Sequence, residues 1–142
     1  MTQDSPSHQS QPDAARLAAE RFPTLGIVGA GLIGSSIARA AARFMPSVTR
    51  ILVGADEATA ARAGVFGLGA VCTTDMAALA AADLVIFAVP VGAMGHVAVA
   101  ARPHLKVGAV VSDVGSVKAS VALAAVPHMP EGCVFVPAHP VA

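Results

Sequence analysis

The sequence predicts an α/β fold built on a doubly wound parallel sheet, and three observations predict it. Short apolar runs alternate with helical patterns along the chain, as they do in proteins that interleave strands and helices. The run over 83–89 is almost unbroken in its apolar character, which is typical of a strand covered on both faces. The composition agrees, since 55% of the 142 residues are hydrophobic, 13 are glycine, and tryptophan and tyrosine are absent.

The elements follow one another in regular order. We expect strands over 25–28, 50–53, 70–72, 83–89, 107–112 and 133–136. We expect helices over 13–21, from the first glycine-rich turn to 44, over 56–62, 76–81 and 93–101, and from about 116 to a stop at Pro127 and Pro130. Gly64 should close the helix over 56–62, and Thr74 or Asp75 should cap the next one. In the helix that ends at residue 44, the predicted apolar face consists of Ile33, Ile37, Ala41 and Phe44. In the last helix, the predicted apolar face consists of Val117, Val121 and Ala125.

The chain divides into two parts. Residues 1–22 read as a flexible N-terminal tail with one short helix, since residues 1–12 are rich in Ser, Gln, Pro and Asp and should be disordered. Residues 23–142 read as a single domain, which is an ordinary size for one hydrophobic core.

A glycine-rich turn follows the first strand. It reads Gly29-Ala30-Gly31-Leu32-Ile33-Gly34 and opens a helix. In the Rossmann-type dinucleotide-binding fold, the first glycine permits the tight turn, the second lets the pyrophosphate approach the backbone, and the third lets helix and strand pack closely. We therefore predict a dinucleotide site held by residues 29–34, with the anion at the N-terminus of the helix.

An acidic residue stands where this fold needs one. Asp56 ends the second apolar run, about 20 residues beyond Gly34, which is the interval expected for the carboxylate that binds the adenosine ribose. Its charge would repel a 2′-phosphate, and no Arg or Lys follows before Arg62. The predicted cofactor is therefore NAD rather than NADP.

Several other classes of function find no support in the sequence. The formal net charge is zero, so neither nucleic acid nor an anionic membrane is an expected partner. No apolar run reaches the length of a membrane span, and the first residues do not resemble a secretory signal, so we expect a cytoplasmic protein. Cys72 and Cys133 stand alone and read as small buried side chains; we expect no metal site.

Candidate chemical groups gather at the predicted carboxyl ends of the later strands. The Val89-Pro90 turn follows the fourth strand, Ser116 and Lys118 follow the fifth, and His139 follows the sixth. Histidine is the natural base at neutral pH. Ser116 could cap a helix or bond the base or a substrate hydroxyl, and the spacing leaves the role of Lys118 open. Asp113 is expected to brace its turn rather than to react.

The segments GIVGAGLIGSSIA, DLVIFAVPVGAM, VVSDVGSVK and FVPAHPVA, in this order, resemble the prephenate/arogenate (cyclohexadienyl) dehydrogenase family of tyrosine biosynthesis. The resemblance runs from Leu25 to Ala142. It implies an NAD-dependent oxidative decarboxylation in which His139 is the base, Ser116 orients His139 and the ring hydroxyl, and the Val89-Pro90 turn lines the adenosine side. The small-molecule substrate would be prephenate or arogenate.

The resemblance also implies what this chain lacks. Family members continue after HPVA into a helical domain that forms a homodimer and supplies arginines to the substrate carboxylates. We therefore expect this chain to be the cofactor-binding part of a longer enzyme and to turn over poorly or not at all alone.

Two alternative interpretations stay open at this point. One is a reductase of the β-hydroxyacid dehydrogenase or pyrroline-carboxylate reductase kind, which shares the glycine turn. The other is an NAD-binding regulatory sensor, such as those that gate potassium transporters, which needs no catalytic histidine.

Overall fold

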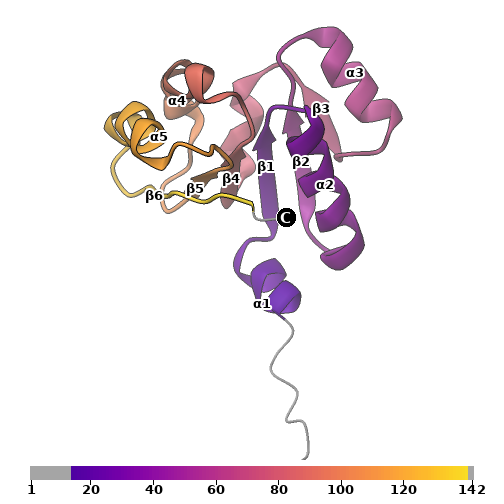
Figure 1. Ribbon diagram of the computed structural model, residues 1–142. Coiled ribbons are helices and arrows are strands. Elements are labelled where there is room, and N and C mark those ends of the chain that lie inside the picture. The colour runs from indigo at the N-terminus through magenta and orange to yellow at the C-terminus, as the bar shows by residue number, and fades with distance from the viewer. Residues whose placement is uncertain (1–13, 141–142) are drawn as a thin grey trace, which may run out of the picture.

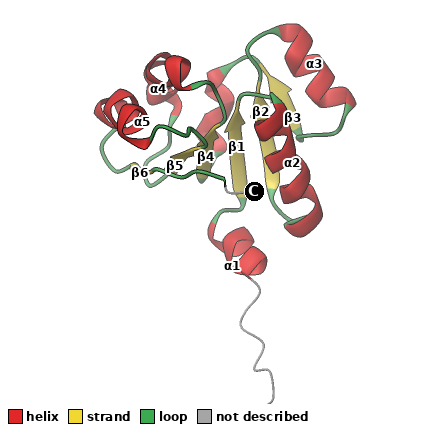
Figure 2. Ribbon diagram, in the orientation of Figure 1, coloured by secondary structure: helices red, strands yellow, loops and turns green. Residues whose placement is uncertain are grey.

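A computed structural model of the chain describes residues 14–140. It contains one sheet of six parallel strands in the order β3-β2-β1-β4-β5-β6 (Figure 2). The strands are β1 (Thr24–Val28), β2 (Thr49–Val53), β3 (Val71–Thr73), β4 (Leu84–Phe87), β5 (Val110–Asp113) and β6 (Val134–Val136). Since strand order reverses between β1 and β4, a ligand crevice is expected where the carboxyl ends of these two strands diverge.

Helices connect the strands. The α-helices are α1 (Ala14–Arg21), α2 (Leu32–Phe44), α3 (Glu57–Val65), α4 (Met94–Ala101) and α5 (Lys118–Ala125). Four 3₁₀ segments complete the connections: η1 (Met76–Ala81), η2 (Val91–Ala93), η3 (Arg102–His104) and η4 (Val126–His128). The alternation of strand and helix confirms the predicted doubly wound α/β fold.

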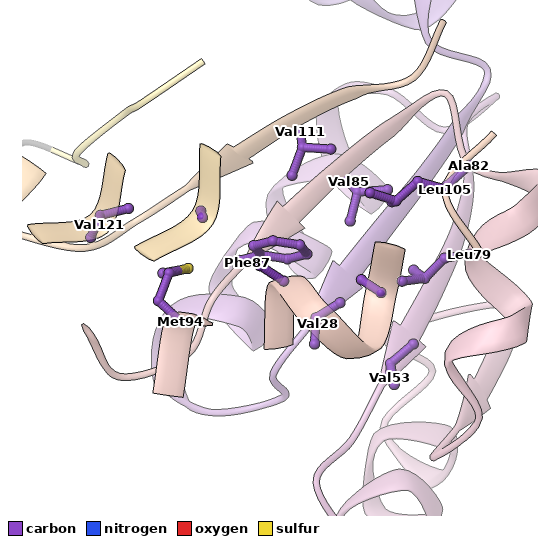
Figure 3. Packing of buried hydrophobic residues seen from close by; sticks show 13 residues of the cluster. Val28, Val53, Leu79, Ala82, Val85, Phe87, Met94, Leu105, Val111 and Val121 are labelled. Atoms are coloured by element: carbon purple, nitrogen blue, oxygen red, sulfur yellow. The ribbon is translucent and has the colours of Figure 1, made fainter. Parts of the chain in front are cut away.

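Each face of the sheet packs on its own apolar cluster. Figure 1 shows α2 in front of β1 and β2, with α4 and α5 at the other end of the sheet. Helix α2 packs through Ala38 and Ala41 on Ile27 and Leu52. The opposite face packs on α4, α5 and η1, and Figure 3 shows Phe87 of β4 among its neighbours there. Successive residues of β1 point to opposite faces of the sheet, so Ile27 lies in one cluster and Val28 in the other. The strands are thus covered on both faces near the centre of the sheet.

The predicted apolar face of α2 is wrong in detail. The buried residues of this helix are Gly34, Ala38 and Ala41, whereas Ile33 and Phe44 are 41% and 61% exposed. The physical reason is the close approach of α2 to the turn before it, which only small residues permit. Of the four predicted residues, Ala41 is buried and Ile37 packs partly buried against the same cluster, so the prediction holds for the middle of the helix.

Several other elements differ from expectation in type or bounds. Residues 76–81 form a 3₁₀ segment rather than an α-helix, and its cap is Asp75, whose carboxylate accepts from the Ala77 amide at 2.8 Å. The fifth strand begins at Val110 rather than at 107, because Gly108 (φ +82°) makes a turn that exposes Val107. Helix α3 runs to Val65 and does not end at Gly64.

The expected disorder of residues 1–12 lies outside the described residues, whereas the short helix expected in the tail is α1. Among residues 14–140, no helix combines the length and the apolar character that crossing a membrane requires.

Candidate dinucleotide-binding site

The three glycines of the turn between β1 and α2 occupy three different environments. Gly29 has φ +102°, and a Cβ there would lie 2.3 Å from the Ala88 carbonyl oxygen. At Gly34 a Cβ would lie 1.9 Å from the Gly29 carbonyl oxygen. At Gly31 nothing lies within 4 Å of the added Cβ. Two glycines therefore hold helix, turn and β4 together, and the third leaves open space beside the backbone.

The N-terminus of α2 has no cap from the protein. Its N-cap residue is Gly31, which has no side chain, and no side-chain cap is found among residues 14–140. The first amides of any helix have no partner within it, so those of Leu32, Ile33 and Gly34 are left for another acceptor. Ala30 is tied to the turn, since its carbonyl oxygen accepts from the Ser35 hydroxyl at 3.1 Å. Open space, free amides and a helix dipole together suit a phosphate group.

Asp56 lies after β2, as the N-cap of α3. One carboxylate oxygen accepts from the Thr59 amide at 2.7 Å, and this hydrogen bond holds the pKa of Asp56 below its ordinary value. The residue is exposed and lies after the carboxyl end of β2, the strand beside β1. An ionised, fixed carboxylate of this kind is suited to accept hydrogen bonds from ribose hydroxyls.

The Val89-Pro90 turn lies beside the glycine turn. A Cβ at Gly29 would lie 3.1 Å from Cγ1 of Val89, which places this side chain next to the first glycine. Pro90 is exposed and begins the 3₁₀ turn η2. The end of β4 therefore adjoins residues 29–34, as the predicted cofactor edge requires.

Asp113 and Lys118 form an ion pair at the carboxyl end of β5, in which the carboxylate is buried and the lysine is partly exposed. Asp113 is 1% exposed, and its carboxylate also accepts from the Gly115 amide at 2.7 Å and the Ala138 amide at 3.2 Å. The Lys118 ammonium donates to the Ala138 carbonyl oxygen as well. The expectation that Asp113 braces its turn is confirmed, and the pair also fixes the residue before His139.

His139 and Ser116 are both exposed at this edge of the sheet. Nδ1 of His139 lies 2.7 Å from the Pro140 carbonyl oxygen, and among residues 14–140 no hydrogen bond joins His139 to Ser116. The reading of Ser116 as a helix cap is wrong, because α5 begins at Lys118, its N-cap is Val117, and no side chain caps it. The hydroxyl of Ser116 is therefore left for other partners.

Sequence reasoning missed that Asp113 and Lys118 act together on Ala138. A charged residue at the end of an apolar strand, followed five positions later by a lysine, was the available signal, but it does not name the third partner. The contact joins segments 20 residues or more apart in the chain, and only the sheet order brings them side by side.

Two surface hollows lie away from this edge. One of about 280 Å³ is formed between α1 and the end of α2, and one of about 370 Å³ lies between α2 and the end of α3. Neither contains a predicted site residue. Within the described part of the chain, no group of three or more His, Cys, Asp or Glu residues is placed to hold a metal ion.

Comparison with known proteins agrees with this geometry. Residues 37–142 match the family described as prephenate dehydrogenase, nucleotide-binding domain. The chain belongs to this family. The match starts inside α2, so it is independent of the glycine turn at 29–34.

Individual relatives extend the likeness over most of the chain. This chain is 43% identical over 122 residues to a cyclohexadienyl dehydrogenase of Zymomonas mobilis. The alignment covers 85% of this chain and 41% of the relative. A Synechocystis arogenate dehydrogenase structure superposes with a TM-score of 0.75 at 29% identity, over 82% of this chain and 40% of that one.

A third relative was solved with ligands. The structure of prephenate dehydrogenase from A. aeolicus with hydroxyphenyl propionate and NAD+ superposes with a TM-score of 0.70 at 25% identity, over 83% of this chain and 41% of that one. The chain thus spans about two fifths of the length of the relatives it matches.

Proposed function

We propose that this chain is the NAD-binding part of a dehydrogenase that oxidatively decarboxylates prephenate, arogenate or both, and that it is inactive alone. The observation that carries the proposal is the turn over 29–34, where Gly29 and Gly34 are sterically obligatory and Gly31 faces open space beside uncapped amides. Membership of the prephenate dehydrogenase family supports it. The family match also favours this reading over a β-hydroxyacid dehydrogenase, a pyrroline-carboxylate reductase or a regulatory sensor.

The residues present fit a dinucleotide. Residues 29–34 would hold the pyrophosphate, Asp56 the adenosine ribose, and Val89 and Pro90 the adenosine side. The carboxylate of Asp56 is ionised at neutral pH, since its pKa lies below even the ordinary value of 3.8, so a 2′-phosphate placed there would be repelled. NAD, when bound, supplies the hydride acceptor for the substrate ring.

His139 is proposed as the base. In the reaction, the ring carbon that bears the hydroxyl gives up its hydride, His139 takes the hydroxyl proton, carbon dioxide leaves, and the ring becomes aromatic. The exposed Ser116 hydroxyl, free of a capping role, would bond His139 or the ring hydroxyl. Because aromatisation drives the reaction forward, the protein needs chiefly to align these groups.

The remaining requirements are assigned outside this chain. The substrate carries two carboxylates, which arginines bind best in a bidentate manner, and the described edge presents Lys118 already paired with Asp113. We propose that a further domain supplies the arginines and a homodimer interface, and that the protein works in the cytoplasm without nucleic acid or membrane partners.

The test is the formation of reduced nicotinamide, followed by its near-ultraviolet absorbance. The chain as given and a longer protein that continues past Ala142 would each receive NAD with prephenate or arogenate. We expect signal from the longer protein only. His139→Asn in the longer protein should lower kcat by about 100-fold or more and leave NAD affinity within about two-fold.

Two results would contradict the proposal. One is turnover by the 142-residue chain at the rate of the longer protein. The other is a folded, NAD-binding longer protein that oxidises neither substrate, which would favour the regulatory sensor.

A further inference from the structure

The residue before His139 is held through both its amide and its carbonyl oxygen. The Ala138 amide donates to Oδ1 of Asp113 at 3.2 Å, and the Ala138 carbonyl oxygen accepts from the Lys118 ammonium. Lys118 and Asp113 in turn pair with each other. Three groups from β5, α5 and the segment after β6 thus form one closed set of contacts directly next to His139.

Little else in the described chain holds this segment. Strand β6 is at the edge of the sheet and pairs only with β5. Its Val134 and Val136 are 57% and 46% exposed, and residues 137–140 are all exposed. The Ser112 hydroxyl donates to the Val136 carbonyl oxygen at 2.8 Å, but this bond lies three residues before His139. Burial of apolar surface therefore contributes little to the position of His139.

The buried carboxylate makes the contact selective. Asp113 is almost wholly buried, and three donors contact its carboxylate: the Gly115 and Ala138 amides and the Lys118 ammonium. Loss of one partner would leave a poorly compensated buried charge. Because the other two donors are fixed in the turn after β5, at Gly115, and on α5, at Lys118, the third donor is needed where Ala138 lies. The carboxylate thereby defines a single place for the backbone at 138.

We propose that Asp113 and Lys118 are positioning residues. They hold His139 at the carboxyl edge by binding the amide and the carbonyl oxygen of Ala138. This clamp is defined as Asp113, Lys118 and the backbone of Ala138. Its role in turnover rests on the proposed function of His139, whereas the clamp itself is a local structural claim. The ammonium of Lys118 has three N–H donors, and it donates to the Asp113 carboxylate and to the Ala138 carbonyl oxygen. These two contacts explain why a lysine follows β5 at this position.

The test replaces Lys118 and measures backbone order at 138 and 139. In the 142-residue chain, amide ¹⁵N relaxation gives order parameters for Ala138 and His139. We expect order parameters of about 0.85 in the unmodified protein and below about 0.6 in Lys118→Met. Lys118→Arg should restore most of the order, since a guanidinium can donate to both the carboxylate and the carbonyl oxygen.

The matched control is Lys106→Met. Lys106 also pairs with an aspartate, Asp83, but near the amino ends of the strands, so its loss should leave order at 138 and 139 unchanged. If Lys118→Met does not fold, the double variant Asp113→Asn/Lys118→Met removes the uncompensated charge and is measured in its place. Unchanged order at 138 and 139 in a folded variant would overturn the clamp, as would unfolding of both variants, because the proposed role is local.

A second arm connects the clamp to turnover. In the longer protein, Lys118→Met should lower kcat at least about ten-fold, with KM for NAD within about two-fold, and Lys118→Arg should recover most of kcat. An unchanged kcat alongside lost order would overturn the positioning role. If the unmodified longer protein turns over neither substrate, the proposed function fails, and the relaxation measurement still decides the clamp.

Discussion

Two places along the carboxyl edge of this sheet, the β1–α2 turn in its interior and the β6 end, are built by different means. At the β1–α2 turn, backbone atoms fix the geometry: Gly29 and Gly34 are so closely packed that a single added carbon would overlap a carbonyl oxygen. At the β6 end, side chains fix it: the Asp113–Lys118 pair holds Ala138, and the surrounding residues are exposed. The turn is thus fixed by close backbone packing, whereas the segment after β6 depends on side-chain contacts.

This difference suits the two tasks proposed for the edge. A pyrophosphate is recognised by backbone amides at a helix N-terminus, so a turn that cannot rearrange is an advantage. A base must be aligned with a reacting hydroxyl, and a side-chain contact can set that alignment at an exposed position. Variants at the two places should therefore differ in what they lose: stability or nucleotide binding at the β1–α2 turn, and local order at the β6 end.

Gly34→Ala should have the largest effect. The new Cβ would lie 1.9 Å from the Gly29 carbonyl oxygen, and neither backbone can yield without moving α2 away from β1. We expect a loss of about 3 kcal/mol in the free energy of unfolding, measured by urea denaturation followed by circular dichroism. Stability equal to that of the unmodified chain would mean that the turn is less tightly packed than described.

Gly31→Ala is the matched control for that variant. Its Cβ would meet nothing within 4 Å, and the backbone at Gly31 (φ −74°) is accessible to alanine. We expect a loss in the free energy of unfolding of less than about 1 kcal/mol, yet NAD affinity at least about ten-fold weaker, because the methyl group would occupy the proposed phosphate position. Equal NAD affinity would contradict that position.

Asp56→Asn should change cofactor selectivity more than stability. Asparagine caps helices about as well as aspartate, so the Thr59 amide keeps an acceptor, but the negative charge is lost. We expect NAD to bind about ten-fold more weakly and the preference over NADP to narrow. Isothermal titration with each nucleotide measures both quantities. A preference that does not change would assign cofactor selectivity to another residue.

The smallest effect concerns the second ion pair, near the amino ends of the strands. The Lys106 ammonium beside Asp83 holds the pKa of that carboxyl below its ordinary value of 3.8, against the opposing effect of its partial burial. A lowered folded-state pKa contributes stability that is complete above 3.8 and is lost as the pH falls through the folded-state value.

The difference in urea midpoint between the unmodified chain and Asp83→Asn should therefore shrink between pH 6 and pH 3. A difference that stays constant across this range would show that the Asp83 charge does not contribute. Because this pair lies near the amino ends of the strands, NAD affinity should not change.

The sequence predicted the parts of the molecule that depend on local patterns. The order of strands and helices and the glycine turn follow from periodicity and from the backbone needs of glycine, and the structure places them as expected. The packing face of α2 could not be read from periodicity, because the short distance between α2 and β1 selects small residues over Ile33 and Phe44.

The β6 end shows the other limit. Asp113 and Lys118 are near each other in the sequence, but their contact with Ala138 depends on β5 and β6 being neighbours. Apolar runs predict that strands exist without predicting which strands pair. The clamp therefore became visible only with the sheet order.

The most direct test of the central claim is an isothermal titration of the 142-residue chain with NAD, with NADP in parallel. The account predicts saturable binding of NAD at one site per chain, weaker binding of NADP, and loss of the NAD signal in Gly31→Val, with the fold retained by circular dichroism. A folded chain that binds neither nucleotide, or that binds NAD equally well in Gly31→Val, would contradict the claim that residues 29–34 form the dinucleotide site.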